Sequence, residues 1–535
     1  ASGTRDFWQR WGLSAARAPG ETLRELAALR MPAQRYPFAR SQQRRIVCHL
    51  GPTNSGKTHA AATQLAAAGD GVYCAPLRLL AQEMHGRWGA GGLGGRSALR
   101  TGEVTVGRWR EAALLACTVE MLGVEGRRWR VAVLDEVQLV ADAQRGAAFT
   151  AALLGCPADV LYLCGEAAAR PLLEAVAARH LHEPLAVVDF ARRRPLLLDP
   201  AGALGDLRAV RPGDCVVAFS RRRILALRDA LRARGLRCAV VHGSLPVACR
   251  VAQAAAFNAA PARTVLVASD AVGMGLNLHI QRVVFDALDK FDGDAVRPVA
   301  PALIRQIAGR AGRFGCASAP PGLVTCLHAA DLPRLADALR AEPPPYPHAV
   351  LGPTDAQLGA LHDALPHPDA PPALLPATLD AYASFAASDD ALFVPADLRV
   401  QRRALRLLAG IDLSPVPLRD ALALLAAPVR PECPVAAAHF ALWARAFACG
   451  RPAPLALSLP RAHAPLLVLE ALHRAAELYL WLAARFPLLF PAHVDAERLA
   501  ASQLEVDVAQ RQSEAGDDLT DAGDLGLSNA SIMPL

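Results

Sequence analysis

Short apolar runs alternate with stretches of helical hydrophobic spacing over residues 45–345. Such alternation is typical of βαβ units, in which strands buried on both faces build a parallel sheet. The runs form two series along the chain, so the pattern predicts an α/β fold with two domains in tandem. The predicted strands are residues 46–50, 72–75, 131–134 and 160–164 in the first series, and residues 215–219, 238–241, 265–268, 283–285 and 323–327 in the second.

The N-terminal region has a different pattern. Leu23, Leu26 and Leu29 lie at helical spacing, and they predict that residues 1–44 form a short helical segment packed on the next domain. This region has no apolar core of a signal peptide, and it carries acidic side chains that an import leader avoids. The sequence begins at Ala1 and not at Met, so removal of a leader before this point stays open.

The strand pattern stops at the prolines 343–345, and leucine- and alanine-rich residues follow. Apolar residues at steps of three and four from Val468 to Phe486 predict one long helix that ends at the next proline. The acidic residues beyond position 500 predict a disordered tail. The predicted domains are a helical N-terminal segment over 1–44, α/β domains over 45–190 and 191–345, a helical C-terminal domain over 346–500, and the tail over 501–535.

Composition narrows the class of protein. The 535 residues carry 57 basic and 50 acidic side chains, a net charge of +7, and 53% of the residues are hydrophobic. This balance excludes a disordered chain and suits a protein of several domains. No uncharged apolar stretch reaches the roughly 18 residues of a membrane-spanning helix.

Two residue types are informative because of how they are used. The 12 cysteines are scattered singly without a CxxC pair, which predicts a reducing compartment and no structural zinc. Lysine occurs only at Lys57 and Lys290, while the other basic residues are arginines. A lysine kept in so arginine-rich a chain indicates a position that requires a compact ammonium group.

Gly51-Pro52-Thr53-Asn54-Ser55-Gly56-Lys57-Thr58 matches the P-loop pattern GxxxxGK[ST]. It directly follows the predicted strand 46–50 and precedes a helical run, which is the context that the motif requires. The glycines allow backbone N–H groups to converge on phosphate oxygens at a helix N-terminus. Lys57 is expected to reach the β- and γ-phosphates, and the Thr58 hydroxyl to ligate Mg²⁺. We therefore predict ATP binding, with other nucleoside triphosphates as alternatives.

Two further elements favour hydrolysis. Asp135 and Glu136 follow the apolar run 131–134, so Asp135 is placed to hold Mg²⁺ and Glu136 to activate a water molecule. In the second domain, Gln306, Arg310 and Arg313 open a predicted helical stretch. The two arginines lie one helical turn apart and would act as arginine fingers toward the γ-phosphate. The predicted catalytic residues are Lys57, Glu136, Gln306, Arg310 and Arg313.

The sequence resembles superfamily 2 helicases, and more closely the mitochondrial degradosome RNA helicases of the suppressor-of-var-three type. Gln138 supports the closer resemblance, because this family ends its second motif in Gln where DEAD-box and DEAH-box enzymes have Asp or His. The motifs that carry the resemblance, in chain order, are GPTNSGKT (51–58), APLRLLAQEM (75–84), TGE (101–103), CTVEM (117–121), DEVQ (135–138), LCGE (163–166), RPGDCVVAFS (211–220), HGSLP (242–246), ASDAVGMGLNL (268–278), LDKFDG (288–293) and QIAGRAGRFG (306–315), with YPFAR (36–40) and LYLWLAARFPLLFP (478–491) outside the core.

The resemblance implies two RecA-like P-loop domains whose facing loops bind nucleotide and RNA. Gly273 and Gly275 are implied to contact the nucleotide. Short hydroxyl side chains and glycines suit an RNA groove, because they bring backbone N–H groups close to phosphates without reading bases. The implied RNA-binding residues are Pro76, Leu77, Arg78, Thr101, Gly102 and Thr118 in the first domain, and Phe219, Ser220, Gly243, Ser244, Ser269 and Asp270 in the second.

The function that these features predict is an ATP-dependent RNA helicase that moves on single-stranded RNA and unwinds duplexes. The resemblance implies 3′→5′ movement, some activity on DNA, mitochondrial location, and partnership with a 3′ exoribonuclease or polynucleotide phosphorylase. Two alternatives stay open at the level of sequence. One is a nucleotide-gated RNA-binding clamp that unwinds little, and the other is a DNA helicase of the same superfamily. A cytoplasmic location is the alternative compartment.

Overall fold

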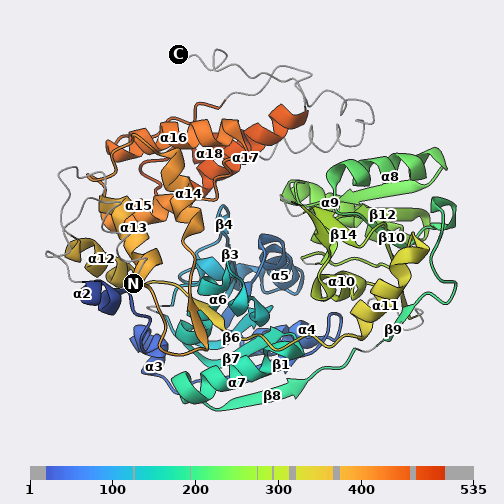
Figure 1. The fold of residues 1–535 in the computed structure, drawn as a ribbon, viewed down its shortest axis with the longest axis horizontal. Helices are drawn as coiled ribbons and strands as arrows, with labels where there is room; N and C mark the ends of the chain where they lie inside the picture. The colour runs from blue at the N-terminus through green and yellow to red at the C-terminus, as the bar shows by residue number, and fades with distance from the viewer. Residues whose placement is uncertain are drawn as a thin grey trace. The chain divides into compact units, whose positions relative to one another are not determined.

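Parallel sheets form where the two series of apolar runs predict them (Figure 1). The computed structural model describes residues 20–124, 127–192, 194–273, 275–291, 295–312, 321–365, 374–457 and 466–499. The chain divides into a first unit, which holds residues up to 193 with 342–460 and 471–501, and a second unit, which holds residues 194–341 and 461–470. The predicted α/β fold is thereby confirmed.

The first sheet has eight strands in the order β4-β3-β5-β2-β6-β7-β1-β8. All neighbouring strands are parallel except β3 and β4. The four predicted strands are present, and β3, β4, β5 and β8 are additional to them. The strands are β1 (Arg45–Leu50), β2 (Gly71–Ala75), β3 (Ser97–Arg100), β4 (Thr105–Val106), β5 (Leu114–Thr118), β6 (Trp129–Asp135), β7 (Ala158–Gly165) and β8 (Leu185–Asp189).

Two helices cover one face of this sheet. They are α4 (Lys57–Ala68) and α5 (Arg78–Ala90), which bury Leu65, Met84 and Trp88 against strand residues such as Tyr73 and Val133. Because side chains alternate along a strand, Ala132 and Leu134 of β6 point to the opposite face. The remaining helices of this region are α6 (Gly146–Gly155) and α7 (Arg170–Val176).

The second sheet has six strands in the order β11-β12-β10-β13-β16-β9, and all neighbours are parallel. Helix α8 packs Ile224, Leu227 and Leu231, three residues spaced along one helix face, onto the centre of this sheet. The elements are β9 (Leu196–Leu198), β10 (Asp214–Val217), β11 (Arg237–Val241), β12 (Thr264–Ala268), β13 (Arg282–Phe285), β16 (Gly322–Cys326), α8 (Arg221–Ala233), α9 (Val247–Ala259), α10 (Pro301–Ala308), α11 (Leu332–Arg340), and the antiparallel pair β14 (Asp289–Phe291) and β15 (Val296–Pro298).

Helices dominate the chain after residue 345. The expectation that strands stop there is nevertheless wrong, because β17 (Ala349–Leu351) and β18 (Phe393–Pro395) form a small parallel sheet. Strands of three residues are too short to leave a hydrophobic period in the sequence. The helices are α12 (Asp355–Ala364), α13 (Leu374–Phe385), α14 (Arg399–Leu407), α15 (Leu418–Leu425), α16 (Pro434–Ala448), α17 (Leu466–Ala483) and α18 (His493–Leu499).

The N-terminal segment is helical in its described part, as predicted. It contains α2 (Gly20–Ala27) and α3 (Pro37–Arg40). Helix α2 packs on α12 and α13, whereas α3 packs on α6, so only the latter contact is with the domain that follows in sequence. In the described part of the chain, no helix combines the length and the apolar character that crossing a membrane requires.

A buried ion cluster in the second sheet joins the first residues of β10 and β13 to the residue that follows β9. Arg282, the first residue of β13, donates to both carboxylate oxygens of Asp214 at 3.0 and 2.7 Å and to Asp199 at 2.7 Å. Asp214 opens β10, and Asp199 follows β9. Burial by itself would raise the pKa of Asp199, but hydrogen bonds from Arg282 and from the Ala201 N–H hold that pKa below its usual value. The cluster therefore fixes the starts of β10 and β13 relative to the end of β9.

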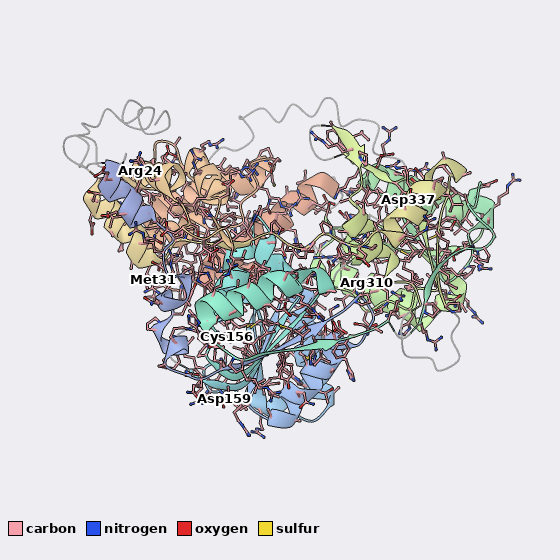
Figure 2. The ribbon with its side chains drawn as sticks, turned by 60° about the horizontal axis from the view of Figure 1, so that its bottom comes forward. Arg24, Met31, Cys156, Asp159, Arg310 and Asp337 are labelled. Carbon is pink, nitrogen blue, oxygen red and sulfur yellow. The ribbon has the colours of Figure 1, made fainter. Side chains whose placement is uncertain are left out.

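We expect Arg282→Ala to lower the free energy of unfolding of the second unit by about 3–5 kcal/mol, because it leaves two buried carboxylates without a counter-charge. The seven tryptophans all lie outside residues 194–341, so in urea unfolding the fluorescence follows the first unit, while circular dichroism follows both. The control is Arg340→Ala, which removes an exposed pair with Asp337 (Figure 2). Equal unfolding curves for the two variants would contradict the role of the cluster.

Candidate functional site

The order of strands in the first sheet groups the sequence motifs into two sets. Parallel strands bring the loops at their carboxyl ends to the same edge of a sheet. Strands β6, β7 and β1 are neighbours, and the loops after them carry DEVQ, LCGE and the P-loop. Strands β3, β5 and β2 are also neighbours. Thr101 and Pro76 begin the loops after β3 and β2, and Thr118 is the last residue of β5. One edge therefore holds two adjacent sets of loops. We call the loops after β6, β7 and β1 the nucleotide half, and the loops at the ends of β3, β5 and β2, which carry residues assigned to RNA, the RNA half.

The P-loop has the conformation that phosphate binding requires. Gly56 has a φ of +91°, a left-handed conformation that glycine adopts without strain, and Lys57 begins helix α4. Lys57 Nζ donates to the Pro52 carbonyl at 3.3 Å, so the side chain folds back over the loop. Ser55 is 3% exposed, and its hydroxyl has no hydrogen-bond partner among the described residues. An unsatisfied buried hydroxyl in this loop fits a phosphate ligand.

Asp135 lies beside the P-loop at the end of β6. Its carboxylate accepts hydrogen bonds from Thr58 Oγ1 at 2.9 Å and from the Tyr73 hydroxyl at 2.8 Å. Burial and the neighbouring charge of Glu136 raise the pKa of Asp135, while Tyr73, Lys57 and Thr58 oppose the rise. The sequence pattern did not predict this contact of Tyr73, although a tyrosine in a fully buried strand usually finds a polar partner.

The hydroxyl of Thr58 and the carboxylate of Asp135 fit Mg²⁺. The ion prefers hard oxygen ligands and is usually held by one or two protein groups together with the phosphates of the substrate. No group of three or more His, Cys, Asp or Glu side chains suited to a metal occurs in the described part of the chain. A nucleotide-bound Mg²⁺ does not need such a group.

Glu136 is held by Gln138 of its own motif, which in turn contacts the LCGE motif. It adopts a left-handed backbone conformation with φ of +56°, and Gln138 Nε2 donates to its carboxylate at 2.5 Å. Gln138 Oε1 in turn accepts from the Glu166 N–H at 3.3 Å. The Tyr346 hydroxyl donates to the Glu166 carboxylate at 3.1 Å. Gln138 therefore orients Glu136, the predicted general base. The sequence, in which Gln138 follows Glu136 by two residues, did not reveal this role.

Two arginines without a predicted role connect the loops of the RNA half. Arg145 donates to Glu120 at 2.6 and 2.9 Å and also to the Pro76 carbonyl. Arg485, which follows helix α17, donates to the Gly102 carbonyl at 3.2 Å. Its guanidinium lies 3.4 Å from the ring centre of Trp481, and burial lowers the pKa of Arg485 to about 10. Arg485 lies within the segment 478–491, which carried the family resemblance. That resemblance was the signal in the sequence that could have pointed to Arg485.

Most of the predicted RNA-binding residues of the first unit make contacts within the protein. Thr101 and Thr118 are buried at the ends of their strands, and the Thr101 hydroxyl accepts from the Val104 N–H at 3.1 Å. Leu77 is the N-cap residue of helix α5, which begins at Arg78. A Cβ atom on Gly102 would lie 3.1 Å from Trp481, so a larger residue would press on that ring. Arg78 forms ion pairs with Glu103 and Glu477.

The second sheet groups its motifs in the same way. Strands β11, β12 and β10 are neighbours, and the loops after them carry the predicted RNA residues. Ser220 caps helix α8 by accepting from the Arg223 N–H at 3.2 Å, and the Ser269 hydroxyl accepts from the Ala271 N–H at 3.1 Å. Asp270 pairs with Lys290 at 2.5 Å. Phe219, Gly243 and Ser244 lie in the same set of loops, so topology brings all six residues of this unit to one edge.

Three predicted nucleotide-site residues of the second unit lie together. Arg310 donates through Nε to the Gly273 carbonyl at 2.9 Å (Figure 2). Gln306 and Ile307 pack beside Gly273, where a Cβ atom would lie 3.3 Å from Ile307. Gly275 has a left-handed φ of +83°.

The prediction that Gln306 opens a helix is wrong. Helix α10 ends at Ala308, so Gln306 lies in its last turn and Arg310 follows the helix in a turn. Gly309 and Gly312 favour termination at this point. Arg313 lies outside the described residues, so the expectation that Arg310 and Arg313 face one phosphate stays a prediction.

Comparisons with known proteins agree with this arrangement. Residues 32–190 match the DEXQ-box helicase domain of Suv3, residues 201–315 match the helicase conserved C-terminal domain, and residues 466–502 match the ATP-dependent RNA helicase SUV3 C-terminal domain. The mitochondrial ATP-dependent RNA helicase SUV3 of Oryza sativa subsp. japonica is 37% identical over 90% of this chain and 81% of its own length. The chain belongs to the SUV3 family.

Other similar proteins match different fractions of this chain and of their own length. The mitochondrial ATP-dependent RNA helicase SUV3L of Oryza sativa subsp. japonica is 39% identical over 87% of this chain, which spans 62% of that protein. Among solved structures, the Escherichia coli DEAH/RHA helicase HrpB is 17% identical, with a TM-score of 0.45 over 85% of this chain and 61% of its own. The residue that distinguishes the SUV3-type motif, Gln138, is the one that contacts Glu136.

His242 is a further polar residue that sequence reasoning left without a role. It directly precedes Gly243, is 3% exposed, and neither ring nitrogen has a hydrogen-bond partner among the described residues. Burial, together with the charges of Arg221 and Arg250, lowers the pKa of His242 to about 4. The folded protein therefore keeps this imidazole neutral near pH 7, next to a loop that the family resemblance assigns to RNA.

This pKa predicts an acid-sensitive second unit. An unfolded histidine titrates near 6.5, so stability present above that pH is lost as the pH falls toward about 4. When the pH falls from 7 to 5, we expect the free energy of unfolding of His242→Asn to decrease by roughly 1–2 kcal/mol less than that of the parent protein. The measurement is urea unfolding by circular dichroism at each pH, with the exposed His279→Asn as control. Parallel pH dependence in all three proteins would contradict the prediction.

Proposed function

We propose that this chain is an ATP-dependent RNA helicase that moves 3′→5′ on single-stranded RNA and unwinds duplexes. The observation that supports it best is the adjacency on one sheet edge of the Thr58–Asp135–Glu136 group and the loops of the RNA half. Membership of the SUV3 family supports the RNA substrate, because the relatives are named ATP-dependent RNA helicases. A P-loop beside a strand-end Asp-Glu pair suits hydrolysis of the β–γ phosphoanhydride.

The residues of the first unit divide the chemical work. The P-loop from Gly51 to Thr58 binds the triphosphate through its backbone, and Lys57 supplies a positive charge. Thr58 and Asp135 would hold Mg²⁺, which would neutralise charge on the phosphates. Glu136, oriented by Gln138, accepts the proton of the attacking water.

Residues of the second unit are part of the same proposal. Gly273 and Gly275 are assigned to nucleotide contact, and Gln306, Arg310 and Arg313 to the γ-phosphate. Arginine groups aimed at this phosphate stabilise the charge that develops during transfer. Arg310 suits the role because its backbone turn and its bond to Gly273 restrict the guanidinium before a ligand arrives.

Location and partners belong to the same proposal. The relatives are named as mitochondrial, and we place this chain in mitochondrial RNA degradation. A helicase that travels toward the 5′ end exposes a 3′ single strand, which is the substrate of a 3′ exoribonuclease or polynucleotide phosphorylase. The net charge of +7 suits local contacts with the phosphate backbone.

Variants of the two central residues should separate binding from hydrolysis. We expect Lys57→Ala to abolish ATP binding. Glu136→Gln should keep ATP and retain bound RNA, while turnover falls by about 10²–10⁴-fold, because the amide cannot accept the proton. Binding of a fluorescent ATP analogue and phosphate release measure the two effects. Normal turnover in Glu136→Gln would exclude it as the general base.

Unwinding assays should decide among the three candidate activities. We expect ATP-dependent displacement of an RNA duplex with a 3′ overhang and little displacement with a 5′ overhang. RNA-stimulated hydrolysis without displacement would identify a clamp. Stronger stimulation by single-stranded DNA than by RNA at the same salt concentration would identify a DNA helicase.

A further inference from the structure

Arg78 is the only guanidinium among the predicted RNA-binding residues, and two carboxylates hold it. It begins helix α5 directly after Pro76 and Leu77. Its Nη1 atom lies 2.9 Å from Glu103 Oε2 and 3.1 Å from Glu477 Oε1. Glu103 belongs to the loop after β3, whereas Glu477 comes from helix α17. The same nitrogen is therefore shared between a carboxylate of the RNA half and one of the C-terminal helices.

The two carboxylates differ in how easily they can leave. The Glu103 side chain is 12% exposed, and burial together with the charge of Glu477 raises its pKa in spite of Arg78. The Glu477 side chain is 30% exposed, and its other carboxylate oxygen lies 3.6 Å from Nδ1 of His473 on the same helix. A carboxylate already in contact with water loses less by rotating into solvent than a buried one does by losing its partner. Glu477 is therefore the carboxylate that can be replaced.

The charges around Arg78 are unfavourable for RNA as they stand. Arg78 faces two carboxylates, and the charge of Arg485 also acts on Glu103. The charge of Arg78 is therefore already compensated within the protein, which weakens its attraction for a phosphate. A phosphate offers the same kind of oxygen acceptor to a guanidinium as a carboxylate does. An incoming RNA phosphate and Glu477 would thus compete for the same cation.

We propose that Glu477 occupies, in the RNA-free protein, the position on Arg78 that an RNA backbone phosphate takes. RNA entry exchanges a carboxylate for a phosphate, and RNA release restores the ion pair. The inference rests on the proposed function, because it needs Arg78 to contact RNA. It makes helix α17 a regulator of RNA affinity in addition to a support for the Gly102 loop.

The test is the sign of the change in RNA affinity. Glu477→Gln keeps the size of the side chain and removes its charge, so we expect a labelled single-stranded oligouridylate to bind about two- to fivefold more tightly. RNA-stimulated ATP hydrolysis should show a KM for RNA lowered by the same factor, with kcat unchanged. A role in orienting Arg78 would instead weaken binding, so weaker or unchanged binding overturns the proposal.

Two further variants keep the result interpretable. Glu83→Gln is the matched control, because Glu83 pairs with Arg87 at 2.6 Å on the same helix as Arg78, outside the predicted RNA residues, and it should not change RNA affinity. Arg78→Gln should weaken binding, and the double variant Arg78→Gln/Glu477→Gln should match it. A gain from Glu477→Gln that persists without Arg78 overturns the exchange. No RNA binding by the parent protein refutes the proposed function itself.

Discussion

The buried carboxylate of Asp135 is the interaction on which the arrangement of the first unit depends. A charged group that is 3% exposed must be hydrogen-bonded, because water no longer stabilises it. Its donors come from three places: Tyr73 in β2, Thr58 in α4, and the N–H of Glu136. Satisfying this one group therefore fixes strand β2, strand β6 and the start of the P-loop helix relative to one another.

Strand β2 links the two halves of the functional edge. It lies between β5 and β6, so it borders both sets of loops. Tyr73 bonds to the carboxylate at the nucleotide half, and Pro76, just beyond the end of the strand, opens the RNA half. A close-packed strand transmits displacement along its length because it has little room to deform. This gives a physical route by which a nucleotide and an RNA strand can influence each other within the first unit.

The C-terminal helices complete the RNA half from far along the chain. Trp481 packs on Gly102, Arg485 bonds to the carbonyl of the same glycine, and Glu477 reaches Arg78. These contacts join loops of the sheet to residues several hundred positions away. The segment 478–491 therefore contacts the loops that the resemblance assigns to RNA.

The sequence by itself determined the parts of the protein whose chemistry is local. The P-loop, the Asp-Glu pair and nine strands of the two sheets were predictable, because glycine conformation, strand periodicity and motif spacing act over a few residues. Tertiary structure alone decided what depends on neighbours in space. The strand order set which loops share an edge, and proximity in the fold selected Tyr73, Gln138, Arg145 and Arg485 as partners. The short strands β17 and β18 likewise follow from packing that leaves no period in the sequence.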